Sequence, residues 1–354
     1  MLLLDTNSLY YITGVEKKTP PNLDVNKMIS EIRHHQRYIT ELNVLEVCTH
    51  YKDDILKIQT LVGEMIKLDI GIIKYPHTIN TRKKEKLFEQ DIRLIYQNLD
   101  ELKEFIKNAL ELRIKIESQF LLFWASNIAS LYLATEFTEN GAMIENVPII
   151  FNTNLVCLAL LITNEDEMFS MDLKEKLHQF YHDEKSINLK DLIVEFVLSI
   201  CKYYLEMYYV SLNNCYYIDY FCNIDDYNET IKKDVSLKLV NDPYYKRLEK
   251  REEEKKILIP EQLRKILENN LSHYEVKMNR NFHPIVINYY KELFLTFYSE
   301  MAKINKNDVI DSLLLNYYPN ITILTFDNKL LNFIKQFNPE YYERIEEIKK
   351  KCFP

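Results

Sequence analysis

Five acidic side chains stand in or next to predicted strands and helices near the two ends of the chain. In chain order they are Asp5, Glu46, Asp308, Asp311 and Asp327. Carboxylates that converge within a few ångströms raise one another's pKa and cost stability unless a cation compensates them. Oxygen ligands of this kind select Mg²⁺ or Mn²⁺, which keep several waters and also accept phosphate oxygens. Because such an ion activates a bound water and neutralises charge on phosphorus, the predicted chemistry is phosphodiester hydrolysis.

The first and last of these acids each follow a predicted strand. Leu2–Leu4 is a continuous apolar run, typical of a strand buried on both faces, and Asp5 comes directly after it. Residues 321–325 form a β-branched run, and Asp327 follows that run. Functional groups gather beyond the carboxyl ends of strands in an open parallel sheet. We therefore expect the two chain ends to form one sheet, with Asp5 and Asp327 at the same edge.

The other three acids lie on predicted helices. A second short strand at residues 37–40 precedes a helix that carries Glu46. Residues 308–317 have the apolar spacing of an amphipathic helix, and Asp308 and Asp311 lie in its first turn. Their i, i+3 spacing places these two acids on one face of the helix. Together the patterns predict an α/β fold with a small parallel sheet.

The middle of the chain is predicted to be mainly helical. Helical patterns occur at residues 87–112, 189–209 and 246–256, and a short strand pattern occurs at residues 236–240. The segment 246–256 mixes charges of both signs at helical spacing, as a solvated surface helix does. We therefore predict a discontinuous catalytic domain of residues 1–78 and 304–354 and a mainly α-helical insertion of residues 79–303.

Four stretches of the sequence resemble PIN-domain nucleases. They read LLLDTNSLYYI, YITELNVLEV, NDVIDSLLLNYY and ITILTFDNKLLNFI, in that order along the chain. The resemblance implies a PIN-like three-layer α/β fold and a Mg²⁺- or Mn²⁺-dependent endonuclease, with RNA expected as substrate more than DNA. The chain departs from small PIN domains in the long segment between its second and third acids, which the predicted insertion would account for.

The resemblance also implies roles for individual residues. Asp5, Glu46, Asp311 and Asp327 match the family's four acids, and Asp308 is an additional acid on the same helix face. Asp311 fits the third position better than Asp308 because of the apolar pair that follows it and its distance to Thr325. Thr325 matches a hydroxyl residue near the scissile phosphate. Polar groups near the metal or phosphate are expected at four further positions: Thr6, Asn7, Thr40 and Asn43.

Charge and cysteine content constrain the partners and the compartment. The formal net charge of −8 gives no overall attraction to nucleic acid, so phosphate contacts must be local, and Arg82, Lys83 and Lys84 are the best candidates. The six cysteines show no CxxC pairing, which is typical of reduced thiols. The apolar run before Asp5 is too short for a signal peptide. These features predict a cytoplasmic protein.

Two alternatives concern membranes and catalysis. Residues 118–135 and 146–164 lack charge, but their polar residues and Pro148 favour buried helices over membrane spans, so no membrane partner is expected. A non-catalytic PIN-like interaction or structural protein is the main rival function. In either case the helical insertion is a candidate surface for a protein partner or for self-association.

Single motifs also have simpler interpretations. An Asp directly after a strand is often only the N-cap of the next helix. A haloacid-dehalogenase-type phosphotransferase would need a second acid where the chain has Asn7. His178 and His182 are one helical turn apart, but the sequence offers no third zinc ligand. The tyrosine-rich segment 202–221 fits helix packing better than base stacking.

Overall fold

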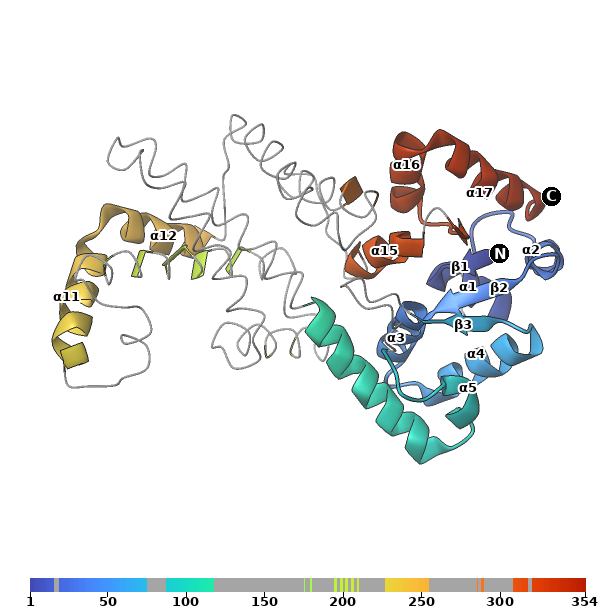
Figure 1. The fold of residues 1–354 in the computed structure, drawn as a ribbon, viewed down its shortest axis with the longest axis horizontal. Helices are drawn as coiled ribbons and strands as arrows, with labels where there is room; N and C mark the ends of the chain where they lie inside the picture. The colour runs from blue at the N-terminus through green and yellow to red at the C-terminus, as the bar shows by residue number, and fades with distance from the viewer. Residues whose placement is uncertain are drawn as a thin grey trace. The chain divides into compact units, whose positions relative to one another are not determined.

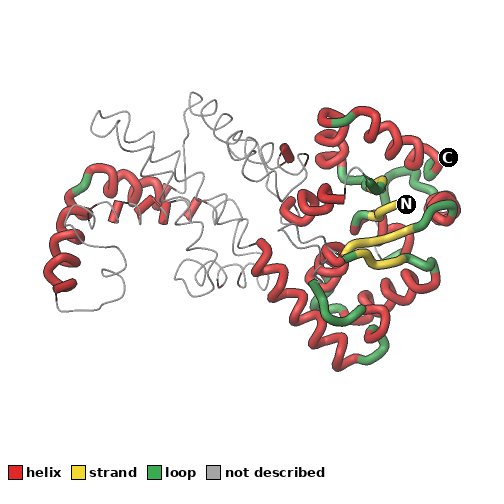
Figure 2. The backbone as a smooth tube through the Cα atoms, viewed as in Figure 1, coloured by secondary structure: helices red, strands yellow, loops and turns green. Residues whose placement is uncertain are grey.

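The computed structural model describes residues 1–15, 19–74, 87–117, 227–254 and 308–354 except 318–319, with single helical positions between 175 and 209 and between 285 and 289. Figure 1 shows the fold and Figure 2 its secondary structure. The chain divides into two compact units. One comprises Met1–Lys115, Leu271–Leu293 and Lys306–Pro354, and the other Ile116–Asn270 and Phe294–Asn305.

The first unit is built on a four-stranded parallel sheet. Its strands are β1 (Leu2–Leu4), β2 (Arg37–Thr40), β3 (Gly71–Ile73) and β4 (Thr322–Leu324), in the order β3-β2-β1-β4. Leu4 is the register partner of Leu324, so the two ends of the chain form neighbouring strands, as expected. The predicted strands at residues 2–4, 37–40 and 321–325 are confirmed within a residue of their limits, whereas β3 was not predicted.

The strand β1 shows why this sequence chooses a parallel sheet. Leu2, Leu3 and Leu4 are each fully buried, which matches a strand covered on both faces. On β4, the Ile323 amide donates to the Tyr341 hydroxyl at 2.9 Å, and that hydroxyl donates to the Ile321 carbonyl at 2.7 Å. Burial of β1 and these hydrogen bonds to Tyr341 hold the edge strand β4 in place.

Helices surround the sheet in the first unit. They are α1 (Thr6–Thr13), α2 (Val25–Arg33), α3 (Glu41–His50), α4 (Ile55–Lys67), α5 (Ile92–Ile95), α15 (Asp308–Leu314) with the 3₁₀ turn η1 (Leu315–Tyr317), α16 (Asn328–Phe337) and α17 (Pro339–Lys351). In Figure 1, α16 and α17 lie on the β4 side of the sheet and α4 and α5 on the β3 side. The helix α17 packs against β4 and α2, and α15 packs against α3. The last pairing brings two acid-bearing helices together.

The first unit extends beyond the predicted boundaries at residues 78 and 304. Residues 99–117 are helical, and the Phe105 ring stacks on Phe88 with centroids 4.6 Å apart. The buried Arg113 guanidinium donates to the Thr49 hydroxyl of α3 at 2.6 Å. From the other direction, the Tyr289 ring packs edge-on against Phe333 of α16 at 4.9 Å. Parts of the predicted insertion therefore belong to the core of this unit.

The second unit contributes two described helices, α11 (Tyr227–Asn241) and α12 (Pro243–Glu254). The predicted strand at residues 236–240 is wrong, because this segment lies inside α11. Val235 and Leu239 are buried one turn apart while Leu237 is two-thirds exposed, which is a helical and not an alternating pattern. Lys238 also pairs with Asp234 at 2.6 Å across one helical turn.

Other helical predictions agree with this unit. The charged segment starting at residue 246 is helical as far as Glu254, with Leu248 as its buried contact. In the predicted helix 189–209, the described positions are helical, and a buried stripe runs through Val194, Leu198, Cys201 and Leu205. Within the described residues, no helix has the length and apolar character needed to cross a membrane. The uncharged stretches 118–135 and 146–164 lie outside them, as do His178 and His182.

Candidate functional site

The predicted acids come together at the carboxyl edge of the sheet. Asp5 directly follows β1 and Asp327 follows the neighbouring β4, and the Asp5 amide donates to the Leu324 carbonyl at 3.1 Å. Glu46 lies on α3, and Asp308 and Asp311 lie in the first turn of α15, the helix packed against α3. The side chains are largely withdrawn from water, since Asp5, Glu46 and Asp308 are 4%, 6% and 2% exposed.

Asp311 reports the electrostatics of this cluster. Its pKa is raised well above the ordinary value, by burial first and then by the negative charges of Glu46, Asp327, Asp5 and Asp308. The pKa of Asp5 is also raised, mainly by burial, with hydrogen bonds from Ser8 and Thr325 opposing the shift and the charge of Asp327 adding to it. The charges of the other four predicted acids therefore all act on Asp311, and that of Asp327 also acts on Asp5.

Two of the acids also serve as helix N-caps. Asp5 Oδ1 accepts a hydrogen bond from the Ser8 amide at 2.6 Å and caps α1. Asp327 Oδ1 accepts from the Leu330 amide at 2.9 Å and caps α16. Asp5 and Asp327 are therefore helix N-caps, which is the simpler interpretation of an Asp after a strand. This role does not exclude a second one. A carboxylate has two oxygens, so a cap leaves acceptor capacity on the same side chain.

A chain of hydrogen bonds orients Glu46. The Thr6 hydroxyl donates to Glu46 Oε2, and Asn43 Nδ2 donates to Thr6 Oγ1 at 3.0 Å. Asn43 Oδ1 in turn accepts from the amide and the hydroxyl of Thr40, at 2.8 and 2.7 Å, which completes the capping box of α3. Thr6, Asn43 and Thr40 are buried. These three residues hold Glu46 in place, whereas Asn7 is exposed on α1, and contacts of the four with metal or phosphate stay a prediction.

Thr325 joins the two acids that follow β1 and β4. Its hydroxyl accepts from the Asp327 amide at 3.0 Å, and the Thr325 side chain is hydrogen-bonded to Asp5. Thr325 is fully buried and links the Asp5 side chain to the Asp327 backbone. Its predicted place near the scissile phosphate stays a prediction.

Lys329 is a member of the site that sequence reasoning missed. Its ammonium lies 2.7 Å from Asp308 Oδ2, and Asp308 is almost completely buried. The sequence could have indicated Lys329 through its position in the first turn of α16, two residues after Asp327. Because Lys329 compensates Asp308, that acid is less available to a cation than Asp311. The ranking of Asp311 before Asp308 as third ligand stays a prediction.

The site suits a hard divalent cation by the chemistry of its donors. Carboxylate oxygens are the ligands that Mg²⁺ and Mn²⁺ prefer, and burial together with the neighbouring carboxylates raises the pKa of Asp311. The oxygens are not preset as a cage, because no group of three His, Cys, Asp or Glu among the described residues lies at metal-binding distance. We expect these carboxylates to point apart, because they repel one another and several of them are held by a helix cap, by Thr6 or by Lys329. The types of donor therefore fit Mg²⁺ or Mn²⁺, but the side chains must move closer together to coordinate such an ion.

The remaining predicted phosphate contacts, Arg82, Lys83 and Lys84, lie outside the described residues. Comparison of the chain with protein-family models, curated proteins and solved structures finds no match.

Proposed function

We propose that this protein is a divalent-metal-dependent nuclease with a PIN-like catalytic unit, and that it hydrolyses phosphodiester bonds. The observation that carries the proposal is the convergence on Asp311 of four other carboxylates from both ends of the chain. A fold gains nothing in stability from such a cluster, because each buried like charge disfavours the others. Clusters that cost stability and lie at the carboxyl edge of a parallel sheet are typical of functional sites.

In this proposal Asp5, Glu46, Asp311 and Asp327 hold Mg²⁺ or Mn²⁺, and Asp308 supports them. When bound, the cation supplies an activated water and neutralises charge that develops on the phosphate. The chain's own residues prepare the site. Thr6 aims the Glu46 carboxylate, Thr325 links the Asp5 side chain to the Asp327 amide, and a bound cation would favour the ionised form of Asp311.

The expected substrate is RNA, on the basis of the motifs shared with PIN-domain nucleases. The order of the four motifs along the chain supports the likeness, and so does a parallel sheet in which the first and last motifs provide neighbouring strands. The acidic edge would repel a nucleic-acid backbone in the absence of metal, so binding and cleavage should both depend on the divalent ion.

The test compares cleavage of end-labelled mixed RNA and single-stranded DNA by the wild type and by Asp5→Asn, in Mn²⁺ and in EDTA. Asn caps a helix as well as Asp does, so Asp5→Asn removes the charge and keeps the fold. Asp53→Asn, at an 85% exposed side chain, is the matched control. We expect Mn²⁺-dependent cleavage by the wild type and the control, and a loss of at least about a hundredfold in Asp5→Asn.

Equal cleavage by wild type and Asp5→Asn would contradict the proposed site. Absence of cleavage in all three proteins, with Mn²⁺ binding also absent, would favour the non-catalytic interaction protein instead.

A further inference from the structure

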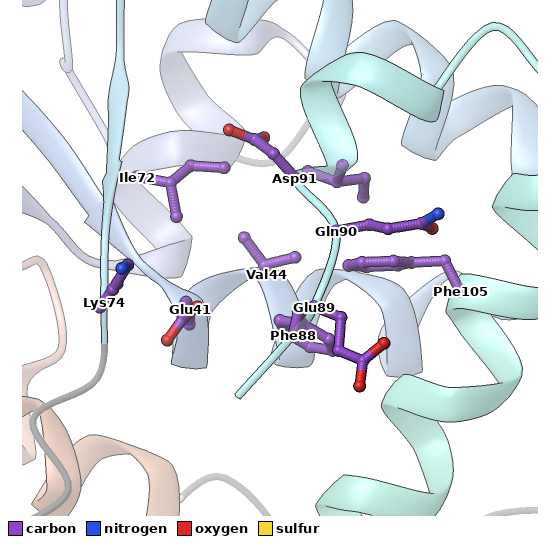
Figure 3. Close-up of a pocket in the computed structure, with 10 residues that line it drawn as sticks. Glu41, Val44, Ile72, Lys74, Phe88, Glu89, Gln90, Asp91 and Phe105 are labelled. Carbon is purple, nitrogen blue, oxygen red and sulfur yellow. The ribbon is translucent and has the colours of Figure 1, made fainter. Parts of the chain in front are cut away.

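A second feature of the same sheet edge is a small pocket beyond β2 and β3. It has a volume of about 110 Å³. Its lining has an apolar floor of Val44, Ile72, Ile92, Phe88 and Phe105 and a polar rim of Glu41, Lys74, Glu89, Gln90 and Asp91. In the view of Figure 3, Val44 lies between Lys74 and Glu41 on one side and Gln90 and Phe105 on the other. An apolar interior with a polar rim suits an uncharged planar group.

The pocket and the acid cluster share the helix α3. Glu41 lines the pocket and Glu46 belongs to the cluster, and five residues of helix rise by about 7.5 Å. Lys74 follows β3, which is two strands from β1 in the sheet, so the two strand ends lie about 10 Å apart. A stacked strand rises by ~3.4 Å per nucleotide along its axis. A strand cleaved at the cluster would therefore reach the pocket within about three nucleotides.

The charges of the rim select the part of a nucleotide that can enter. Among the described residues of the lining, three acids, Glu41, Glu89 and Asp91, face one lysine, Lys74, so these residues would repel a phosphate. Carboxylate and amide oxygens accept hydrogen bonds from the exocyclic amino groups of bases. Glu41 and Asp91 also serve the chain itself, since Glu41 accepts from the Leu87 amide and Asp91 pairs with Arg93. Lys74, Glu89 and Gln90 are exposed.

We propose that this pocket binds one base of the substrate strand near the scissile bond and prefers a base with an exocyclic amino group over uracil. The proposal rests on the proposed nuclease function for the identity of the strand. Single-stranded RNA is commonly recognised through unstacked bases that enter such pockets and contact aromatic side chains. Here the aromatic floor is the stacked pair Phe88 and Phe105.

The test measures base preference in cleavage of short single-stranded RNAs, with each position within four nucleotides of the scissile bond randomised in turn. We expect the wild type to disfavour uracil at one such position by about tenfold. Val44→Phe should fill the pocket, and the double variant Glu89→Ala with Gln90→Ala should remove acceptors from its rim. Both should abolish this preference while Mn²⁺-dependent cleavage continues.

The control is the double variant Gln97→Ala with Glu104→Ala, which removes the same two side-chain types from exposed positions outside the pocket. It should keep the preference. A preference that survives in both pocket variants, or a wild type without any, overturns the proposal. If Val44→Phe fails to fold, the rim variant decides alone.

Failure of the nuclease proposal is distinguished by binding of nucleosides, which carry no phosphate. The full chain is titrated with adenosine, cytidine, guanosine and uridine, and ligand-detected NMR measures their binding. This experiment tests the pocket without requiring cleavage. Weaker binding of uridine that is equalised in the rim variant supports the pocket even if no RNA is cut. A chain that neither cleaves RNA nor binds any nucleoside contradicts both proposals.

Discussion

At the scale of single residues, the site is an arrangement of charges that the fold holds against their repulsion. Burial and four neighbouring carboxylates raise the pKa of Asp311, while Lys329 compensates Asp308 and the Thr6 hydroxyl satisfies one oxygen of Glu46. Each of these contacts has a separate consequence that can be measured. Stability without metal and activity with metal should respond in opposite directions when a clustered charge is removed.

Asp311→Asn should stabilise the metal-free protein at neutral pH and abolish activity. The folded-state pKa of Asp311 lies above its unfolded value, so the folded chain holds more protons, and stability falls as pH rises from the ordinary carboxyl range to the raised pKa. Asp311→Asn removes the carboxyl group whose ionisation lowers the stability of the folded protein. We therefore expect Tm in EDTA to rise by about 2–4 °C for each kcal/mol of unfolding free energy gained. Thermal melts from pH 4 to 8, with and without Mn²⁺, measure it.

The control for this melt is Asp53→Asn at an exposed position. It should follow the wild type at every pH and keep the stabilisation by Mn²⁺ that binding to the native state produces. A metal-free Asp311→Asn protein that melts below the wild type at pH 8 would show that the carboxylate stabilises the fold.

Thr6→Val should lower activity by about ten- to a hundredfold through misplacement of Glu46, since residues that orient ligands typically contribute that much. Valine nearly matches the shape of threonine but leaves Glu46 Oε2 and Asn43 Nδ2 without their shared partner, at a cost of about 1–3 kcal/mol. Steady-state cleavage kinetics and urea unfolding measure the two effects. Thr6→Ser keeps the hydroxyl and should retain most activity, so equal losses in both variants would rule out the relay.

At the scale of elements, short strands deliver the acids and helices begin on them. The strand β1 ends at Leu4 and α1 begins at Thr6, so Asp5 has both a strand-end and a cap position. Asp327 has the same relation to α16. The packing of α15 against α3 then adds acids from two helices. At both ends of the chain, a strand is therefore followed within a few residues by a helix that an Asp caps.

Two substitutions of Asp327 distinguish its role as a helix cap from the role of its negative charge. Asp327→Asn and Asp327→Ala both remove the negative charge, but only Asn can still accept from the Leu330 amide. We expect the Ala variant to be less stable than the Asn variant by about 1 kcal/mol, and both to lose cleavage equally. Urea unfolding and Mn²⁺-dependent cleavage measure the pair. Retained activity in Asp327→Asn would mean that only the cap matters.

At the scale of the whole molecule, the first unit is closed by its termini. Leu4 pairs with Leu324 in β1 and β4, and the Ser8 hydroxyl donates to the Leu324 carbonyl at 2.9 Å. The Asp24 amide donates to the Cys352 carbonyl at 2.9 Å, and Lys351 pairs with Glu31 at 2.8 Å. Folding of the first residues therefore requires the last ones, whatever lies between them in sequence.

Ile323→Ala should loosen both ends together. Ile323 is fully buried in β4, and a cavity there should cost about 2–5 kcal/mol. Hydrogen exchange followed by mass spectrometry should show faster exchange in peptides covering residues 1–14 as well as 320–331. Leu237→Ala, at a two-thirds exposed position of α11, should leave both peptides unchanged. Unchanged exchange in residues 1–14 of Ile323→Ala would contradict a shared cooperative unit.

The sequence by itself determined the elements that carry the acids, because apolar periodicity and helix caps are local signals. It also predicted that Asp5 and Asp327 meet, since parallel strands place their carboxyl ends at one edge. It did not reveal β3, whose three residues include Gly71. That glycine is required by tertiary contact, because a Cβ there would lie 2.7 Å from the Tyr38 ring.

Only the tertiary structure decided what each polar neighbour does. Thr6 and Thr325 are hydrogen-bonded to Glu46 and Asp5, and Asn43 and Thr40 continue the chain of hydrogen bonds that begins at Thr6. The pairing of Lys329 with Asp308, and the membership of residues 99–115 and Tyr289 in the first unit, depend on contacts between distant segments. Such contacts arise from the packing of whole elements, which no local pattern encodes.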